Sequence, residues 1–206
     1  MKRYLTVLQQ KKKVIRKKIL ERRALLNSAI LNMAEKSAAE QLASTEDYRA
    51  SKTIMLYMNF RNEVPTGSII NNIRYSGKKL VLPYTNKEFE IIPYEIPLAG
   101  ELKDYLVRSR FGVLEPDPSL CKEANVNSID LVVVPGSVFD ITNNRIGYGK
   151  GCYDRFLSKL PASVYKIGLA YDFQVLPSVP TTQTDVKMDE ILIIETNIMK
   201  KKTSHA

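Results

Sequence analysis

Short runs rich in valine, leucine and isoleucine recur along the chain, and polar segments separate them. Runs of five or six such residues are typical of strands that are buried on both faces of a parallel sheet. The clearest of them is residues 129–134, where Val and Leu follow one another almost without interruption. We predict strands at residues 53–58, 79–83, 89–94, 129–134, 166–170 and 191–195.

Helical patterns occupy several of the segments outside these runs. Near the N-terminus, Leu8, Ile15, Ile19 and Leu26 recur at helical spacing among basic residues. This pattern predicts an amphipathic helix over residues 6–27. We expect further helices at residues 28–43, 67–76 and 152–160.

The alternation of strands with helices predicts an α/β fold. We expect a single domain over residues 1–199, with a largely parallel sheet flanked by helices in a Rossmann-like three-layer architecture and a basic helix at its N-terminus. Residues 200–206 are interpreted as a basic tail that is disordered. No run approaches the roughly 20 apolar residues that span a bilayer, and the N-terminus lacks the apolar core of a secretory signal. We therefore expect a cytoplasmic protein.

The positive charge of the chain is concentrated at one end. Its 31 Lys and Arg residues against 22 Asp and Glu residues give a net charge of +9, and ten of the basic residues fall within residues 1–23. A protein that binds nucleic acid over its body would spread basic groups across one face. The N-terminal concentration predicts either a local anion site or a solvated helix.

Histidine and cysteine are too scarce for several classes of chemistry. The single histidine, His205, lies in the C-terminal tail, and Cys121 and Cys152 are not spaced as metal ligands. This composition argues against serine–histidine catalysis, zinc sites and a disulfide framework. Chemistry in this protein would use charge, carboxylates, hydroxyls and a hard metal.

Three glycines occupy every second position in a stretch that comes after the strand predicted at residues 129–134 and a following loop. The stretch Arg145-Ile-Gly-Tyr-Gly-Lys-Gly151 lets backbone N–H groups turn toward an anion. Its spacing fits neither the Walker A loop nor the dinucleotide fingerprint. A tight structural turn is the alternative, but Arg145, Lys150 and Asp154 nearby favour a site for magnesium and nucleotide.

Residues 135–157, PGSVFDITNNRIGYGKGCYDRFL, resemble the signature of the 5-formyltetrahydrofolate cyclo-ligase family, also called methenyltetrahydrofolate synthetase. The resemblance extends over most of the chain. It includes the basic N-terminal helix, a Tyr and a Glu at the ends of residues 57–63, a GxxEP segment at 112–116 and DVKMDEI at 185–191.

The resemblance implies an ATP- and Mg²⁺-dependent enzyme that converts 5-formyltetrahydrofolate into 5,10-methenyltetrahydrofolate and releases ADP and phosphate. Transfer of the γ-phosphoryl group to the formyl oxygen would create a leaving group, and N10 would then close the ring. No protein nucleophile is needed, which agrees with the scarcity of histidine. The implied partners are small molecules, namely ATP and a folate with or without a polyglutamate tail; we expect a monomer that binds neither membrane nor nucleic acid.

The resemblance also assigns residues by motif. Catalytic roles fall to Arg145 and Lys150. Folate binding falls to Met58, Glu63, Tyr148, Gly149, Lys150, Gly151 and Cys152. Magnesium binding falls to Asp154 and Asp189. ATP binding falls to Lys12, Lys13, Arg16, Arg145, Ile146, Gly147, Tyr148, Gly149, Lys150, Gly151, Cys152 and Tyr153.

Simpler interpretations remain open for some of these residues. Asp154 fits a helix N-terminus, where a carboxylate is favoured by the dipole, and Asp189 fits a turn before a strand. Lys12 and Arg16 are four residues apart, and such a pair arises readily in so basic a helix. Cys152 departs from the family pattern, which commonly has Tyr there, and this departure would weaken stacking against a substrate.

Two other classes of function remain open from the residues alone. A sugar-phosphate isomerase or an acyl-CoA enzyme of similar architecture would use the same loop for phosphate without turning over ATP. A nucleic-acid-binding protein would use residues 1–23 as a basic arm and would bind in a strongly salt-dependent way.

Overall fold

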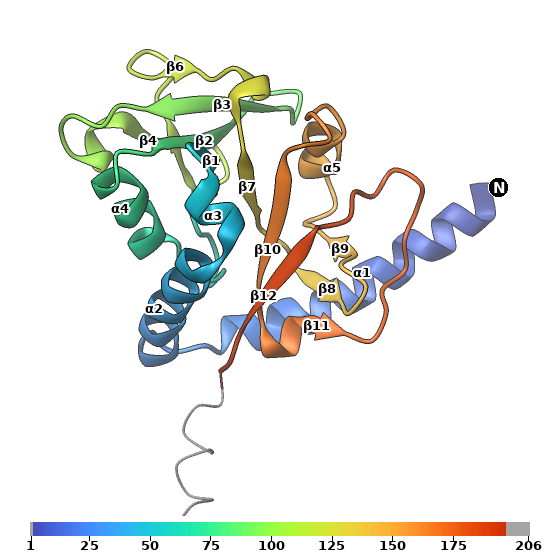
Figure 1. Cartoon of the computed structure of the whole chain (residues 1–206). Helices are drawn as coiled ribbons and strands as arrows, with labels where there is room; N and C mark the ends of the chain where they lie inside the picture. The colour runs from blue at the N-terminus through green and yellow to red at the C-terminus, as the bar shows by residue number, and fades with distance from the viewer. Residues whose placement is uncertain (1, 197–206) are drawn as a thin grey trace, which may run out of the picture.

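A sheet of seven strands forms the centre of the computed structural model, which describes residues 2–196 (Figure 1). Its first five strands are parallel, and the last two run antiparallel to their neighbours. In spatial order the strands are β12 (Glu190–Ile194), β10 (Tyr165–Tyr171), β7 (Leu131–Val134), β1 (Thr53–Met55), β2 (Lys79–Thr85), β3 (Ile91–Ile96) and β6 (Lys122–Glu123).

The strand β7 shows why the apolar runs form the middle of this sheet. All four of its residues are fully buried. Leu131 and Val133 belong to the apolar cluster on one face, and Val132 and Val134 belong to the cluster on the other face. A parallel strand that is covered on both faces needs apolar residues at every position, so an unbroken run predicted it correctly.

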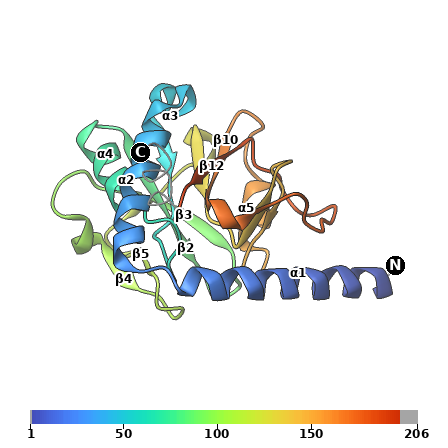
Figure 2. The ribbon, with the colours of Figure 1, turned by 90° about the horizontal axis from the view of Figure 1, so that it is seen from below.

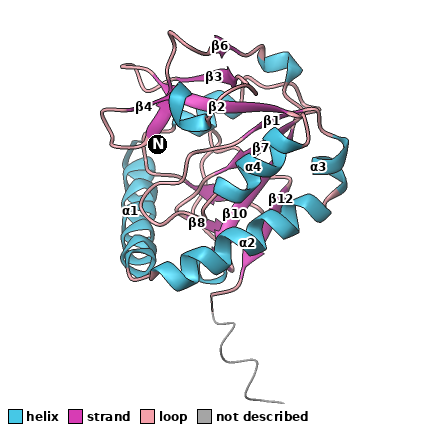
Figure 3. Cartoon of the chain, turned by 90° about the vertical axis from the view of Figure 1, so that its left-hand side faces the viewer, coloured by secondary structure: helices cyan, strands magenta, loops and turns pink. Residues whose placement is uncertain are grey.

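Helices cover one face of the sheet. The helices α2 (Ser28–Ser44), α3 (Glu46–Ala50) and α4 (Gly67–Tyr75) pack there, as the view of Figure 3 shows for α2 and α4. Ala34, Ala38 and Leu42 of α2 and Ile69 and Ile73 of α4 provide the buried side chains. The small alanine side chains let α2 lie close to its neighbours.

The opposite face carries a short helix and a second, smaller sheet. The helix α5 (Cys152–Leu157) packs on the large sheet through Phe156 and Leu157. The small sheet has the order β11 (Val175–Leu176), β8 (Val138–Asp140) and β9 (Arg145–Ile146). Three layers are therefore present, which confirms the predicted α/β architecture.

The basic helix α1 (Lys2–Ala24) runs along one side of the molecule, and its N-terminal part projects beyond the body (Figure 2). Ile15 and Ile19 pack against Val138, Ile146 and Val179. Val138 and Ile146 belong to the strands of the small sheet. The apolar stripe predicted for helix α1 therefore fixes the helix next to β9, where the glycine-rich stretch begins.

Several boundaries differ from the predictions. The strand predicted at residues 53–58 ends at Met55, the helix predicted at 152–160 ends at Leu157, and the helix predicted at 6–27 ends at Ala24. The prediction also missed the short elements, whose few residues carry no periodic pattern. These are the helix α3, the strands β6, β8, β9 and β11, the hairpin β4 (Leu106–Arg108) and β5 (Leu114–Pro116), and the 3-10 turns η1 (Leu102–Tyr105), η2 (Val126–Ser128) and η3 (Asp172–Gln174).

No helix within residues 2–196 is long and apolar enough to cross a membrane. The tail predicted at residues 200–206, together with the last three residues of the predicted domain, lies outside the described part of the chain.

Candidate active site

A cleft of about 1520 Å³ opens at the carboxyl ends of the strands β1 and β7. Tyr57 and Met58 follow β1 into this cleft, and Pro135 follows β7. Helix α1 and residues 182–186 form the opposite side. Ligands of open α/β sheets commonly bind at the carboxyl ends of parallel strands, so the position of the cleft is that of a binding site.

Three glycines shape the loop between β9 and α5, which we call the glycine loop (residues 147–151). Gly149 and Gly151 have φ values of +101° and +66°, and residues other than glycine rarely adopt such backbone angles. A Cβ atom on Gly149 would lie 3.3 Å from the guanidinium of Arg16, and one on Gly147 would lie 2.8 Å from Nη1 of Arg145. Glycine is therefore required here both by the turn and by the approach of two arginines.

Helix α1 brings its cations to this loop. Arg16 Nε donates to the carbonyl oxygen of Gly147 at 2.7 Å, and Lys12 Nζ contacts Asp185 Oδ2 at 2.5 Å. Lys13 also lines the cleft. Partial burial lowers the pKa of Arg16. Because Arg16 contacts the glycine loop and Lys12 contacts Asp185, which also lines the cleft, the predicted pair lies at the cleft and is not part of an unattached basic arm.

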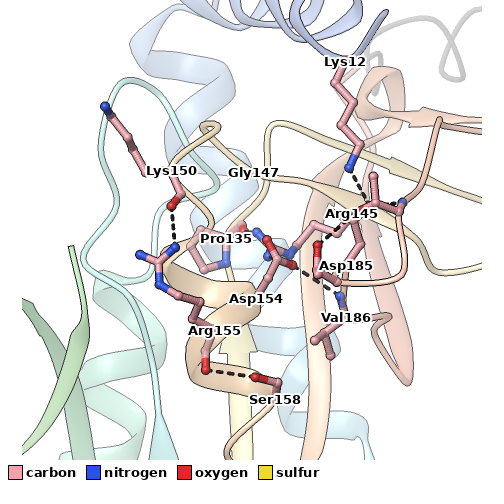
Figure 4. Close-up of polar contacts among 12 residues, drawn as sticks. Lys12, Pro135, Arg145, Gly147, Lys150, Asp154, Arg155, Ser158, Asp185 and Val186 are labelled. Atoms are coloured by element: carbon pink, nitrogen blue, oxygen red, sulfur yellow. Dashed lines mark hydrogen bonds and ion pairs between the residues drawn. The ribbon is translucent and has the colours of Figure 1, made fainter. Parts of the chain in front are cut away.

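Arg145 and Asp154 form an ion pair at the base of the glycine loop (Figure 4). Arg145 Nη2 lies 2.8 Å from Asp154 Oδ1, and Nη1 donates to the carbonyl of Pro135 at 3.3 Å. Arg145 is only 4% exposed, and its Nε has no hydrogen-bond partner among the described residues. The backbone N–H of Val186 also donates to Asp154 Oδ1. The pair ties the loop to the first turn of α5 and to residues 185–186.

Lys150 occupies the outer side of the same loop. Its side chain is exposed and, in Figure 4, extends to the opposite side from Lys12. Its Nζ lies 4.9 Å from the centre of the Phe89 ring, and its carbonyl accepts a hydrogen bond from Arg155 at 2.8 Å. The ammonium group makes no ion pair with a described carboxylate, so it is available to an anionic ligand.

Glu63 is a buried carboxylate at the floor of the cleft. Oε2 accepts a hydrogen bond from the Phe60 N–H at 2.9 Å, whereas Oε1 has no partner of normal geometry among the described residues. Burial raises the pKa of Glu63, and the nearby charge of Arg23 opposes this rise. Met58 lines the cleft beside it. An unpartnered buried oxygen of this kind suits a ligand that donates hydrogen bonds.

Other residues of the motif have mixed roles. Ile146 is buried against helix α1, so its side chain serves packing. The hydroxyl of Tyr148 accepts a hydrogen bond from Arg23, and burial raises the pKa of Tyr148 well above its ordinary value. The ring of Tyr153 lies 5.7 Å from the Arg145 guanidinium. Cys152 lines the cleft and is partly exposed.

Asp189 corrects one of the predictions. It precedes β12, and its Oδ2 accepts from both the backbone N–H and the Nζ of Lys166 at 2.7 Å. These contacts are at the amino ends of β10 and β12, whereas the cleft lies at the carboxyl ends of the strands beside them. Asp189 is therefore not brought together with Asp154, and its carboxylate stabilises the start of a strand.

Asp185, four residues earlier, lies in the cleft instead. Its Oδ2 accepts from Lys12 and from the backbone N–H of Thr182, and the adjacent Val186 contacts Asp154. Asp185 begins the DVKMDEI segment, so this segment reaches the cleft through Asp185 and not through Asp189. The path of the chain in the folded protein decides which of Asp185 and Asp189 reaches the cleft, and the sequence pattern does not give that path.

Further residues in or behind the cleft were not predicted. Arg23, which contacts Arg61 and Tyr148 of the lining, was hidden in a run of basic residues. Glu115 lines the cleft and was noted only within the GxxEP segment. Phe89 and Phe111 lie 5.8 Å apart with Arg110 packed against both rings. Their positions on separate loops carry no common sequence signal.

Cations outnumber acids along the described lining of the cleft, with eight Lys or Arg residues against four Asp or Glu residues. No cluster of three His, Cys, Asp or Glu side chains that could enclose a metal ion occurs within residues 2–196. Asp154 uses only Oδ1, and Asp185 uses only Oδ2, in the contacts above. The second oxygens fit a Mg²⁺ ion that is held mainly by ligand phosphates and water, because Mg²⁺ commonly takes only one or two protein carboxylates.

Comparison with known proteins agrees with this cleft and fold. The sequence pattern of the 5-formyltetrahydrofolate cyclo-ligase family matches residues 8–194. A 5-formyltetrahydrofolate cyclo-ligase of Haemophilus influenzae is 29% identical over 151 residues, which cover 71% of this chain and 78% of that protein.

Solved structures give the same result. The 5,10-methenyltetrahydrofolate synthetase of Aquifex aeolicus superimposes with a TM-score of 0.76 at 28% identity and covers 90% of each chain. The synthetase of Mycoplasma pneumoniae gives a TM-score of 0.69 at 27% identity, over 87% of this chain and 96% of that one. The chain therefore belongs to the 5-formyltetrahydrofolate cyclo-ligase family of enzymes.

Proposed function

We propose that this protein catalyses the ATP- and Mg²⁺-dependent cyclisation of 5-formyltetrahydrofolate to 5,10-methenyltetrahydrofolate, with release of ADP and phosphate. The observation that carries this proposal is the presence, in one cleft, of a cation-rich glycine loop and a buried carboxylate with a free oxygen. The loop suits a polyphosphate, and the carboxylate suits the N–H groups of a pterin. Membership of the family makes these two ligands the natural pair.

The chemistry begins with a poor leaving group. The formyl oxygen of the substrate is an amide oxygen, which does not depart unless it is first activated. Transfer of the γ-phosphoryl group to this oxygen gives an imidoyl phosphate, and the lone pair of N10 then attacks the same carbon. N10 loses its proton, the C–O bond breaks, and the oxygen leaves as part of inorganic phosphate. Catalysis therefore depends on orientation and on positive charge around the moving phosphoryl group.

The phosphates of ATP are assigned to the space between the glycine loop and helix α1. Arg16 already contacts the loop at Gly147, and Lys12 approaches from the same helix face. Lys150, on the other side of the loop, has an ammonium group free of carboxylate partners. We assign to Lys150 the neutralisation of charge on the transferred group. Arg145 is bonded to Asp154 and to Pro135, so its part is to hold the loop in shape.

Asp154 and Asp185 are the residues that would hold Mg²⁺, each through its second carboxylate oxygen. The ion would supply neutralisation of the phosphate oxygens. Asp185 then has two roles, because its other oxygen accepts from Lys12 and so links helix α1 to residues 182–186.

The folate is assigned to the floor of the cleft beside Glu63 and Met58. The free Oε1 of Glu63 would accept a hydrogen bond from the pterin, and Met58 would pack against the ring. The partly exposed Cys152 lies between this region and the loop, where its small side chain leaves room for a ligand.

A turnover experiment tests the proposal. Purified protein is mixed with ATP, Mg²⁺ and 5-formyltetrahydrofolate, and the methenyl product is followed by its near-ultraviolet absorbance. We expect product to form only when all three are present. Omission of ATP and omission of Mg²⁺ with added chelator serve as controls. Folded protein that yields no product above background would overturn the assignment.

A further inference from the structure

A buried arginine in the last turn of helix α1 joins three parts of the cleft. Arg23 is 1% exposed, whereas the adjacent Arg22 is exposed. Its guanidinium donates to the carbonyls of Arg61 at 3.0 Å and Gly136 at 3.4 Å, and to the hydroxyl of Tyr148. These partners come from the segment after β1, the segment after β7 and the glycine loop. One side chain therefore connects the floor of the cleft to the loop above it.

The contacts of Arg23 are all to neutral oxygens. Burial of a guanidinium is costly unless its charge is compensated. The buried counter-charge is Glu63, on which Arg23 acts through space, and whose carboxylate is also affected by the Tyr148 hydroxyl. A neutral donor would satisfy the same carbonyls, so the positive charge needs an explanation beyond packing.

The surroundings of Glu63 contain one cation and several phenols. Burial raises the pKa of Glu63, whereas the positive charge of Arg23 and the nearby Tyr148 hydroxyl act in the opposite direction. The other groups that face Glu63 are Tyr57 beyond β1, Tyr153 on α5 and Tyr171 on β10. Arg23 therefore supplies positive charge that favours the carboxylate form of Glu63.

We propose that Arg23 is a positioning residue for the folate substrate, which fixes the Tyr148 hydroxyl and supports the buried Glu63 carboxylate as a hydrogen-bond acceptor for the ligand. This inference rests on the function proposed above. It deepens that function because it extends the folate site to the far end of a helix whose other cations are assigned to ATP. Helix α1 then serves both substrates, with Lys12 and Arg16 at the phosphates and Arg23 behind the carboxylate.

Replacement of the charge tests the proposal, with Arg23→Met compared with Lys18→Met. Lys18 is an exposed cation of the same helix, so the control matches the loss of net charge. In Arg23→Met we expect the KM for 5-formyltetrahydrofolate to rise about tenfold, as for the loss of one hydrogen bond to a charged group, while the KM for ATP stays within about twofold. The Lys18→Met variant should match the wild type in both constants.

The dependence of activity on pH distinguishes this role of Arg23 from a purely structural one, which would leave the pH profile unchanged. Activity should fall as the pH decreases through the pKa of Glu63, because a protonated carboxyl accepts hydrogen bonds from the folate less well. Loss of the Arg23 charge raises that pKa further, so the fall should occur at a higher pH in Arg23→Met than in Lys18→Met. Equal profiles in the two variants would overturn the proposal.

A measurement without substrate separates this inference from the proposed function. The Glu63 carboxylate is titrated by carbon NMR in the ligand-free protein, with the signal assigned by its loss in Glu63→Gln. We expect a higher titration midpoint in Arg23→Met, and this result does not require turnover. Failure of the wild type to form product would count against the function, whereas an unchanged midpoint would count against the role of Arg23.

Two further variants keep the test decisive if Arg23→Met does not fold. Arg23→Lys retains the positive charge and should keep the wild-type midpoint. Tyr148→Phe removes the hydroxyl that Arg23 fixes and should raise both the midpoint and the KM for the folate. If Tyr148→Phe changes neither quantity, Arg23 serves only the packing of the helix.

Discussion

Some residues of this cleft are both charged and buried. Burial of a charged group costs stability, and this cost indicates that the group interacts with a ligand. Glu63 is 5% exposed, and one of its oxygens has no hydrogen-bond partner within residues 2–196. Arg145 is 4% exposed, and its Nε has no partner in the same part of the chain. Unsatisfied buried groups are uncommon in folded proteins because each costs stability. In the proposed function, Glu63 recovers this cost when folate binds.

The substitution Glu63→Gln should stabilise the fold and weaken the binding of folate. Burial raises the folded-state pKa of Glu63 above its ordinary value of 4.5. The ionised form therefore destabilises the fold, and this loss grows as the pH rises from about 4.5 through the folded-state pKa. We expect Glu63→Gln to melt at a higher temperature than the wild type at neutral pH, with the difference vanishing in acid, and to bind the folate more weakly.

Thermal melting followed across pH, together with the KM for the folate, checks both parts of this prediction. A variant that melts at the wild-type temperature throughout the pH range would contradict the assigned cost of the buried charge. An unchanged KM would remove Glu63 from the folate site.

Lys150→Ala tests the cation that we place at the transferred phosphoryl group. Removal of one preorganised stabilising group commonly costs about 10²- to 10³-fold in kcat. We expect a loss of this size without a change in melting temperature, because the Lys150 side chain is exposed. Lys159→Ala serves as the control, since Lys159 is also an exposed lysine and pairs only with Glu90 at 3.7 Å. In steady-state kinetics, the kcat of Lys150→Ala should be lower than the kcat of Lys159→Ala by about 10²- to 10³-fold.

The sequence predicted residue types better than it predicted their arrangement. Gly149, Lys150 and Glu63 were found from their motifs, and all three line the cleft. Asp189 was predicted at the metal site, whereas Asp185 is the acid of that segment that lines the cleft. Only the path of the chain separates the two acids. Arg23 was missed, since burial of one cation within a basic helix depends on tertiary packing.

At the scale of elements, the basic helix and the glycine loop form one unit. Gly149 and Gly151 have positive φ values, which favour glycine, and Arg16 fills the space beside Gly149. The long buried strands were predicted because both their faces are apolar. The short strands β8 and β9, which hold this loop, have two or three residues and no usable pattern.

Gly149→Ala should disable this unit. A side chain in a left-handed conformation costs roughly 1–2 kcal/mol, and its Cβ would press on the Arg16 guanidinium at 3.3 Å. Gly77→Ala is a matched control, because Gly77 has a φ of +73° and nothing within 4 Å of its Cβ position. We expect both variants to lose similar stability in chemical denaturation, but only Gly149→Ala to lose most of its turnover.

Equal turnover in the two glycine variants would show that the shape of the loop does not matter for the reaction. Loss of turnover in both would instead indicate that the change in stability alone explains the effect.

At the scale of the whole molecule, the net charge of +9 is explained by its location. Ten of the basic residues lie within residues 1–23, and the structure directs Lys12 and Arg16 to a cleft that other loops also line with cations. This arrangement favours a small, highly charged anion over an extended nucleic acid. The fold class was predicted as a whole because alternating strands and helices leave few arrangements for a parallel sheet.

The central claim is that ATP activates the formyl oxygen within this cleft, and an isotope experiment tests it most directly. 5-Formyltetrahydrofolate labelled with ¹⁸O at the formyl oxygen is converted with unlabelled ATP and Mg²⁺ in unlabelled water, and the released phosphate is analysed by mass spectrometry. We predict that one ¹⁸O atom appears in the phosphate for each methenyl product formed. Unlabelled phosphate accompanying product formation would contradict the account.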